Sequence, residues 1–529
     1  MTTATIDAAT LAAGPRVKPA AHWHDRLAQG LLLLVCAILI VFLLAPLFMI
    51  LVKSVQDKDG AFVGLQQFTE YFQTASLQQS ILHTISVAAA VTGITIPLAF
   101  TFAYALTRSC MPLKSTFRVI ALTPILAPSL LAAISFIQWF GTQGLLKGLL
   151  GGAKIYGPIG IILSSIYAVF PHALMIVLTA LLLADGRLYE AAESLGTPTL
   201  RRFFTITLPG AKYGLISAAM VVFSYTVSDF GIPKIIGGNF NVLALDIFKQ
   251  VIGQQNFNKG AVVSLILLLP VLVAFIVDWS MQGRQKAQFS SRAVPYAPKP
   301  KRGFDAVMFL YCLIISLLLL AVLFMAIYTS FIKLWPYDKS FSLRHYTFGL
   351  VDGGVIVAFF NSLKMALLTA VFGTILIFGG AYLIEKSRGM TGLRAFIRLL
   401  AAIPMGVPGM VLGLGYIFFF NHPDNPLPLS RHDHPGDRDY RALLHIEPPH
   451  RGDGVEGPRQ RIRGRVGEPE GAVLQDLFPR HCSGLPARHS RHRPLSLRQR
   501  DGNDLRGRLP LFARHQARIA GDTEPRRRR

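Results

Sequence analysis

The chain has 529 residues, of which 52% are hydrophobic and only 16% are charged, and its mean hydropathy is +0.45. Soluble domains carry about 25% charged residues, so this composition excludes an ordinary soluble protein and favours several membrane spans. The formal net charge of +24 fits either a nucleic-acid-binding protein or a membrane protein with basic cytoplasmic loops. The positions of the charges must decide between these two classes.

Nine apolar segments before residue 421 are long enough to cross a bilayer as helices, which takes about 20 residues each. Residues 1–30 are polar and basic, and the apolar run after them is longer than that of a cleaved signal peptide. We therefore expect an all-α polytopic membrane protein that keeps this N-terminal segment. The predicted spans are near 31–52, 81–106, 118–138, 159–184, 213–232, 260–281, 306–331, 357–384 and 399–420.

The basic residues are distributed unevenly between the loops on the two sides of these spans. With the N-terminus placed inside, the inner segments hold 20 Lys and Arg residues and the outer segments hold ten. Thirteen of the 14 arginines before residue 421 fall inside, the exception being Arg344. An excess of Lys and Arg in short loops marks the cytoplasmic side, so we expect a cytoplasmic N-terminus.

Two blocks of the chain share a pattern of residues. Six spans separate corresponding helices, so the copies have parallel topology and can pair around a pseudo-two-fold axis along the membrane normal. We predict a first unit at 31–282, a cytoplasmic linker at 283–303 and a second, incomplete unit at 304–420. The matches are Leu65 with Leu343, Phe68 with Tyr346, Thr69 with Thr347, Ala103 and Tyr104 with Ala381 and Tyr382 (offset 278), and Arg118, Pro124 and Pro128 with Arg398, Pro404 and Pro408 (offset 280).

A polar segment between the fourth and fifth predicted spans, residues 185–212, carries a spaced motif: Glu-Ala-Ala, three residues, Gly, nine residues, then Ile-x-Leu-Pro. Glu and Ala favour a helix, Gly196 permits a sharp break and Pro198 is well placed to begin a second short helix. We therefore predict a helix–turn–helix on the cytoplasmic side. The motif residues are Glu190, Ala191, Ala192, Gly196, Ile206, Leu208 and Pro209.

This motif resembles the coupling loop of permease subunits in bacterial binding-protein-dependent ABC importers, and it departs from that loop at no signature position. By this resemblance the loop docks on a cytoplasmic ABC ATPase, Glu190 makes a polar contact there and Gly196 sets the bend. The resemblance also implies type I permease units, a homodimeric ATPase, a periplasmic substrate-binding protein and a place in the bacterial inner membrane. The residues alone also allow an amphipathic helix at the membrane surface, with Arg201 and Arg202 on lipid phosphates.

The chain itself is not expected to be an enzyme. The Gly-x-x-x-x-Gly-Lys-Ser/Thr motif of phosphate-binding loops is absent from the sequence, so ATP and Mg²⁺ are expected on the separate ATPase. The four cysteines show no Cys-x-x-Cys or Cys/His spacing. We therefore predict no catalytic residue, no metal site and no cofactor on this chain.

Two units in one chain resemble the fused permeases of importers for ferric iron and for 2-aminoethylphosphonate. Residues 228–238 and 247–255 look most like the phosphonate group, so the expected function is the translocation path for 2-aminoethylphosphonate, with ferric iron as the alternative. A secondary transporter driven by an ion gradient is the alternative of another class. Such a protein uses ionisable residues at mid-membrane and needs no coupling loop.

Five residues are candidates for lining the translocation path. Asp229, near the outer end of the fifth predicted span, either meets an amine of the substrate or caps a helix end in periplasmic water. Pro124 and Pro128 break the third predicted span, and Pro404 and Pro408 break the ninth. By resemblance to the family such kinked helices line the path; the simpler interpretation is helix bending alone.

Residues 421–529 differ in composition from the rest, with 22 Arg, no Lys, nine of the 14 His and 13 of the 32 Pro. No span or packed fold is predicted there, and the second coupling loop that the repeat places near residue 470 is absent. Because aromatic residues for base stacking are scarce, no nucleic acid is expected. An extended periplasmic tail and a reading frame shifted near 421–430 remain. We favour the frameshift, since a GC-rich gene read out of frame yields Arg, Pro and His without Lys.

Overall fold

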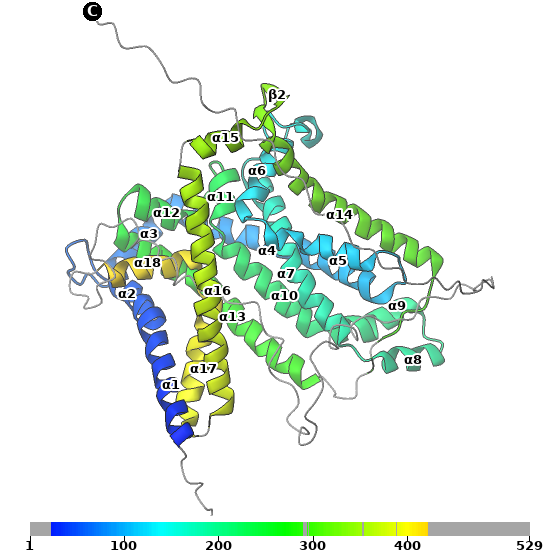
Figure 1. Ribbon diagram of the computed structural model, residues 1–529, viewed down its shortest axis with the longest axis horizontal. Coiled ribbons are helices and arrows are strands. Elements are labelled where there is room, and N and C mark those ends of the chain that lie inside the picture. Colours follow the sequence, from blue (N-terminus) through cyan, green and yellow to red (C-terminus); the bar gives the residue numbers. More distant parts are fainter. Residues whose placement is uncertain (1–22, 289–293, 295, 352–353, 388, 422–529) are drawn as a thin grey trace, which may run out of the picture. The chain divides into compact units, whose positions relative to one another are not determined.

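The computed structural model describes residues 23–288, 294, 296–351, 354–387 and 389–421 (Figure 1). The predicted all-α fold is confirmed, and the one departure among these residues is an antiparallel hairpin of β1 and β2. The elements are α1 (Trp23–Leu39), α2 (Ala45–Ser54), α3 (Gln66–Gln73), α4 (Ala75–Arg108), α5 (Lys114–Leu122), α6 (Ser129–Phe140), α7 (Pro158–Leu182), α8 (Gly186–Ser194), α9 (Thr199–Arg202), α10 (Leu208–Ser228), α11 (Gly231–Ile236), α12 (Leu243–Phe248), α13 (Phe257–Gln288), α14 (Arg302–Ser330), β1 (Ile332–Leu334), β2 (Asp338–Phe341), α15 (Arg344–Val351), α16 (Gly354–Lys386), α17 (Thr391–Ala402) and α18 (Gly409–Phe420). Short π turns lie at Ile40–Leu44, Phe203–Thr207 and Lys249–Gly253, and 3-10 turns at Thr123–Leu126, Lys147–Leu150 and Ile403–Gly406.

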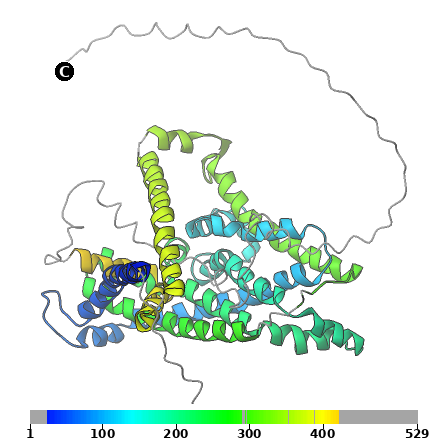
Figure 2. The ribbon, with the colours of Figure 1, turned by 60° about the horizontal axis from the view of Figure 1, so that its bottom comes forward.

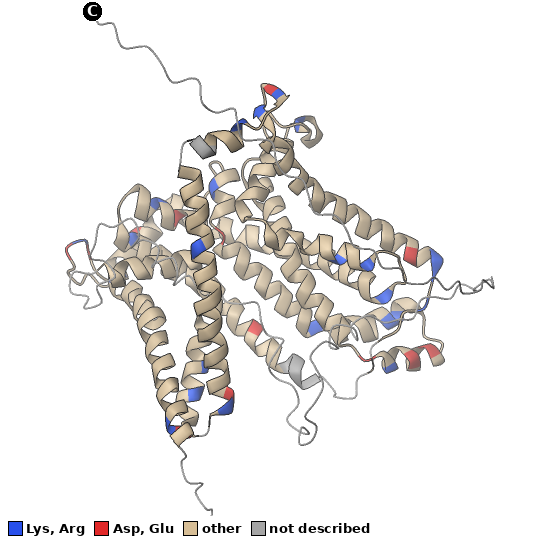
Figure 3. Ribbon diagram, in the orientation of Figure 1, with Lys and Arg blue, Asp and Glu red and all other residues tan. Residues whose placement is uncertain are grey.

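Seven helical segments of the described chain are long and apolar enough to cross a membrane, and they coincide with seven of the nine predicted spans. Lys, Arg, Asp and Glu lie mostly toward the ends of these helices (Figure 3). The predicted third and ninth spans are each a pair of helices, bent by 102° and 114° respectively at the predicted prolines. The prediction that prolines break both spans is confirmed, because Pro128 and Pro408 leave the helical conformation altogether, with ψ of 143° and 139°.

The repeat seen in the sequence is present in the backbone. α4 has 34 residues and α16 has 33. Both bent pairs begin after a residue in the left-handed region, Leu113 with φ of 59° and Met390 with φ of 47°. The offset between the copies rises from 278 to 280 before Arg398, so the second copy contains extra residues there. They lie in the first helix of its bent pair, since α17 has 12 residues and α5 has nine. The shared residues thus direct the same local structure twice.

The first unit packs around four helices. α4 lies against α7 and α10, and α10 lies against α13 (Figure 1). Small side chains such as Ala99, Ala103 and Ala173 are fully buried there, which lets neighbouring helices approach closely without a large apolar side chain between them. This bundle holds the loop between α7 and α10 at one end and the short helices α11 and α12 after the other end of α10.

The first helix of each unit packs on the bent pair of the other unit. α14 contacts α5 and α6, while α2 contacts α18 and α1 contacts α17. At the crossing of α2 and α18 a Cβ on Gly415 would lie 2.7 Å from the backbone oxygen of Pro46. Only glycine fits so close an approach of two backbones.

α16 has far fewer neighbours than its counterpart α4. Its main contacts are with α1, α15 and α17 (Figure 2). In the most apolar window of α4 33% of the residues are buried, against 11% in α16. Large apolar side chains such as Phe372, Ile375 and Phe378 are exposed on it. Among the described residues, α16 therefore has no extensive packing like that of α4 on α7 and α10.

Two predictions lie partly or wholly outside the described residues. Most of the N-terminal segment 1–30 and nearly all of the tail 421–529 lie outside the described residues. The cytoplasmic place of the first and the frameshift origin of the second stay predictions.

Candidate functional site

The predicted helix–turn–helix is present between α7 and α10. α8 begins directly after Asp185, whose Oδ1 accepts a hydrogen bond from the backbone N–H of Arg187 at 3.1 Å. A carboxylate in this position satisfies a backbone donor that has no partner inside the helix. The polar residue just before the motif therefore fixes where the helix starts.

The turn after α8 is a Schellman motif. The backbone N–H of Thr197 donates to the oxygen of Ala192 at 2.9 Å, and that of Gly196 donates to the oxygen of Glu193 at 2.9 Å. Gly196 has φ of 65°, which is typical of the residue that ends such a helix. A Cβ there would meet nothing within 4 Å. Glycine is thus required for its backbone conformation and not for space.

Replacing this glycine is expected to loosen the turn. Gly196→Ala places a Cβ in the left-handed region, at a cost of about 1–2 kcal/mol, so the amides of residues 195–197 should exchange hydrogen faster. The matched control is Gly210→Ala in α10, where a Cβ also meets nothing within 4 Å and no positive φ is recorded; it should be neutral or slightly stabilising. Equal exchange rates in both variants would contradict the role of Gly196.

The second half of the motif differs from the prediction. Pro198 precedes α9 as expected, but α9 is no separate short helix: the π turn Phe203–Thr207 joins it to α10, so that Thr199–Ser228 is one continuous segment. The sequence offers neither Gly nor Pro between Thr199 and Leu208 to stop the helix. Pro209 has no N–H to donate to the preceding turn, and it lies two residues after the π turn, where the regular α-helical hydrogen bonding is already interrupted. Any displacement of the turn is consequently carried along the fifth span.

The side chains of the motif differ in how far they are exposed to solvent. Three exposed leucines, which sequence reasoning did not single out, lie in the same loop as Glu190: Leu188, Leu195 and Leu200, at 57%, 83% and 71%. Exposed apolar side chains around a charge are typical of a protein-docking surface. The sequence could have indicated these leucines, because they are large apolar residues within an otherwise polar loop. Glu190, Ala191, Gly196 and Pro209 are exposed, Ile206 and Leu208 are half-buried, and Ala192 is buried.

The structure brings α11, the helix that follows Asp229, to the first bent pair. Asp229 follows the last residue of α10, and its Oδ1 accepts a hydrogen bond from the N–H of Gly231 at 3.1 Å, which is the geometry of an Asx turn before the short helix α11. Its Oδ2 is buried with no partner among the described residues. A Cβ on Gly231 would lie 3.1 Å from Oγ of Ser129, the residue after Pro128. Pro124 lies in the 3-10 turn just before this break and is buried.

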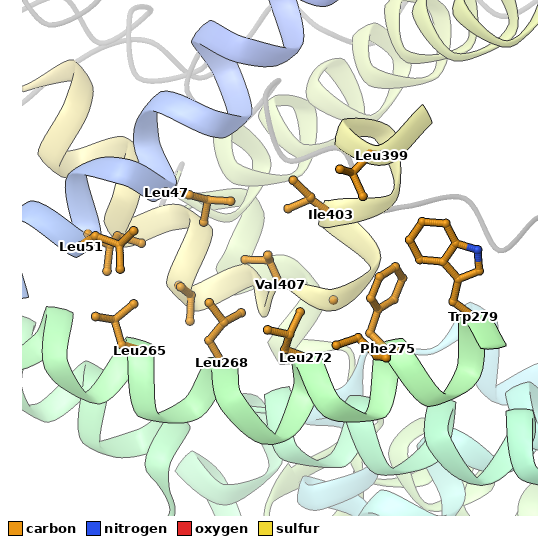
Figure 4. A pocket seen from close by; sticks show the side chains of 14 residues that line it. Leu47, Leu51, Leu265, Leu268, Leu272, Phe275, Trp279, Leu399, Ile403 and Val407 are labelled. Carbon is orange, nitrogen blue, oxygen red and sulfur yellow. The ribbon is translucent and has the colours of Figure 1, made fainter. Parts of the chain in front are cut away.

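Pro404 and Pro408 lie in the second bent pair, which packs on α2 and α13. A pocket of about 370 Å³ opens beside this break (Figure 4). Ile403 and Val407 line it from the bent pair, and Phe275 and Trp279 from α13. None of its lining side chains is charged, so the pocket suits an acyl chain and offers no group that recognises a phosphonate or ferric iron.

A second polar group, absent from the predicted site, lies beyond the C-terminal end of α10. Asp246 on α12 is buried and accepts a hydrogen bond from the amide of Asn241, which also donates to Oγ of Ser80 at 3.0 Å. Burial raises the pKa of the Asp246 carboxyl. These contacts hold α12 against α4. Among the described residues no group of three His, Cys, Asp or Glu is placed to hold a metal ion.

Comparison with known proteins identifies the central part of the chain. Residues 96–286 match the model of a family described as "Binding-protein-dependent transport system inner membrane component". This stretch is a permease domain of that family. It runs from within α4 to within α13 and contains the whole α8 turn and Asp229.

Individual relatives are distant. The ferric transport system permease protein FbpB of Actinobacillus pleuropneumoniae is 24% identical over 417 residues, covering 75% of this chain and 59% of the relative. The spermidine/putrescine permease PotB of Haemophilus influenzae is 24% identical over 253 residues, covering 45% of this chain and 87% of the relative. Both are transport permeases and not enzymes. The chain spans about 60% of the length of the ferric relatives.

A solved bacterial alginate ABC transporter is also similar. It aligns with 51% of this chain and 97% of its own, at 15% identity and a TM-score of 0.41.

Proposed function

We propose that the chain is the membrane subunit of an ATP-driven importer in the bacterial inner membrane, with its N-terminus in the cytoplasm. The observation that carries the proposal is the α8 turn, with Glu190 exposed among leucines, inside a permease domain. The surface docks on a separate ABC ATPase, a homodimer that binds ATP and Mg²⁺. Because the helix is continuous from Thr199 to Ser228, closure of the ATPase moves the fifth span. A periplasmic binding protein delivers the cargo.

The two-unit organisation belongs to the same proposal. The units are residues 31–282 and 304–420, joined by the linker 283–303, and the repeated backbone and the reciprocal packing of α2 on α18 and α14 on α6 support them. A match of 417 residues to FbpB, against 253 to PotB, is in keeping with a chain that contains more than one unit. The open face of α16 supports a second unit without counterparts of α7 and α10. Residues 421–529 contain 22 Arg and no Lys. This composition predicts no membrane span, so the tail does not supply the counterparts of α7 and α10.

An ion-gradient mechanism has less support. Such a mechanism uses ionisable groups within the membrane that can change partner or charge. The described spans contain Asp278 on α13, which is buried, but both its oxygens are engaged: Oδ2 accepts from Nε2 of Gln282 at 2.9 Å and Oδ1 accepts from the hydroxyl of Ser217. A carboxylate held in this way stabilises the packing of α10 on α13.

We propose 2-aminoethylphosphonate as the cargo, on the resemblance of residues 228–238 and 247–255, with Asp229 near the path as a partner for its amine. Ferric iron is the second candidate, because relatives that match three quarters of the chain are named ferric permeases. The bent pairs at Pro124 and Pro128 and at Pro404 and Pro408 are proposed to line the path. The frame-corrected chain provides the test of these assignments.

Strains that carry the frame-corrected gene, its ATPase and its binding protein are expected to grow on 2-aminoethylphosphonate as the sole phosphorus source, and strains without it are not. Uptake of labelled ferric iron, measured in the same strains, distinguishes the second candidate. Iron uptake without growth on the phosphonate would assign ferric iron. Neither activity, in cells where the protein reaches the membrane, would contradict both cargo assignments.

A further inference from the structure

A buried arginine joins three helices at the base of the α8 turn. Arg108, the last residue of α4, is only 8% exposed. Its Nη2 donates to the backbone oxygen of Leu181 on α7 at 3.1 Å and to the hydroxyl of Tyr189 on α8 at 3.3 Å. The Tyr189 hydroxyl donates in turn to Oγ1 of Thr207 at 3.0 Å, at the end of the π turn before α10. One side chain thus links α4, α7 and the proposed docking helix.

The arginine is enclosed by two tyrosines that are far apart in the sequence. Its guanidinium carbon lies 4.7 Å from the ring centre of Tyr189 and 4.5 Å from that of Tyr296, and the two ring centres are 4.7 Å apart. A planar guanidinium over an aromatic face is attracted to it, and more strongly where water is excluded. Tyr296 belongs to the linker between the units and not to the permease domain.

The linker makes further contacts with α8. The N–H of Gly186 donates to the oxygen of Val294 at 2.7 Å, and the N–H of Val294 donates to Oδ1 of Asp185 at 3.3 Å. At the far end of α8, Lys299 and Glu193 form an ion pair of 2.8 Å, which lowers the pKa of the Glu193 carboxyl. That pair is exposed and contributes little by itself. The linker therefore runs along α8 from its first residue to its last turn.

The second copy lacks this arrangement. Lys386 stands 278 residues after Arg108, while the next residues, Ser109 and Ser387, make the same bond, each donating its hydroxyl four residues back at 2.6 Å. Lys386 is exposed. A lysine is a point charge without the flat guanidinium that can pack against two aromatic rings. Arginine thus occurs at this position in the copy that carries the turn.

We propose that residues 294 and 296–301 of the linker act as a strap that fixes α8 to the ends of α4 and α7, by closing Tyr296 over Arg108. This inference rests on the proposed docking of α8 on an ATPase. With the strap closed, a push on α8 displaces the ends of the spans; with the strap open, α8 hinges at Gly186 and the push is lost. Arg108 and Tyr296 are positioning residues in this arrangement.

The test uses the full chain, purified in lipid nanodiscs, and its partner ABC ATPase, purified separately. Tyr296→Ala is expected to raise hydrogen exchange of the α8 amides about tenfold and to weaken ATPase binding about tenfold, by freeing a locally stable segment. The midpoint of global unfolding should stay unchanged. Tyr296→Phe keeps the ring and should restore both values. Lys333→Ala, which breaks the ion pair of Lys333 with Asp338 in the hairpin, should change neither.

The outcomes separate the strap from the function on which it rests. Unchanged hydrogen exchange of α8 in Tyr296→Ala overturns the strap. The strap is also overturned if the midpoint of global unfolding falls far enough to explain the whole increase in exchange. If Tyr296→Ala speeds hydrogen exchange of α8 but the unaltered protein does not bind the ATPase, the strap is supported and the docking role is overturned. Failure of Tyr296→Phe to restore exchange would assign the effect to the hydroxyl and overturn the stacking on Arg108.

Discussion

Cells that express the 529-residue chain with its ATPase and binding protein are expected to show no cargo uptake above background, and a frame-corrected gene is expected to restore it. A fused permease needs two docking turns and two complete walls around its path. The sequence carries one Glu-Ala-Ala turn, and α16 lacks the helices that cover α4 in the first unit. An ATPase dimer would push on one unit, and the other would have no helix to receive the movement.

The measurement is initial-rate uptake of labelled cargo at matched amounts of membrane-inserted protein. A third strain with the corrected gene and an ATPase defective in hydrolysis supplies the background. Equal uptake by the original and corrected chains would contradict both the frameshift interpretation and the need for a second turn.

Reversing the charge of the docking surface is expected to have the next largest effect. Glu190→Lys should weaken ATPase binding by about 30-fold or more, about 2 kcal/mol, the range found when one partner of an interfacial charge pair is lost. The fold should tolerate it, because Glu190 is exposed in the interior of α8 and Glu and Lys have similar helix propensities. Pull-down and titration of the ATPase measure the loss.

The control is Asp59→Lys, which makes the same change of charge on an exposed residue between α2 and α3. It should leave ATPase binding unchanged. Binding that survives Glu190→Lys would favour the other interpretation of this loop, a helix lying on lipid at the membrane surface.

Local sequence was enough to predict much of the fold. Backbone groups in a bilayer are satisfied within a helix, so runs of about 20 apolar residues become helices wherever they occur. The prolines marked the breaks of both bent pairs for a similar reason, since Pro128 and Pro408 cannot continue a helix. The bends of 102° and 114° were not predictable, because their size depends on what each pair packs against: α7 and α14 in one case, α2 and α13 in the other.

The proposed docking site, too, was predicted only in part from the sequence. The Schellman turn at Gly196 and the cap at Asp185 are each encoded within a few residues; the sequence analysis predicted the turn and did not single out the cap. The merging of α9 with α10 was missed because a helix, once begun, continues until a residue stops it. The burial of the second carboxylate oxygen of Asp229 and the closeness of Gly231 to Ser129 come from contacts between distant segments.

The sequence by itself determined where the helices lie, where the chain turns at Gly196 and that the composition changes after residue 420. These properties depend on side-chain chemistry and on bonds between near neighbours. The tertiary structure alone decided that the linker lies along α8, that Tyr296 covers Arg108 and that the first helix of each unit packs on the other. Those contacts join residues far apart in the chain, and their energy depends on shape and burial, which no local pattern of residues specifies.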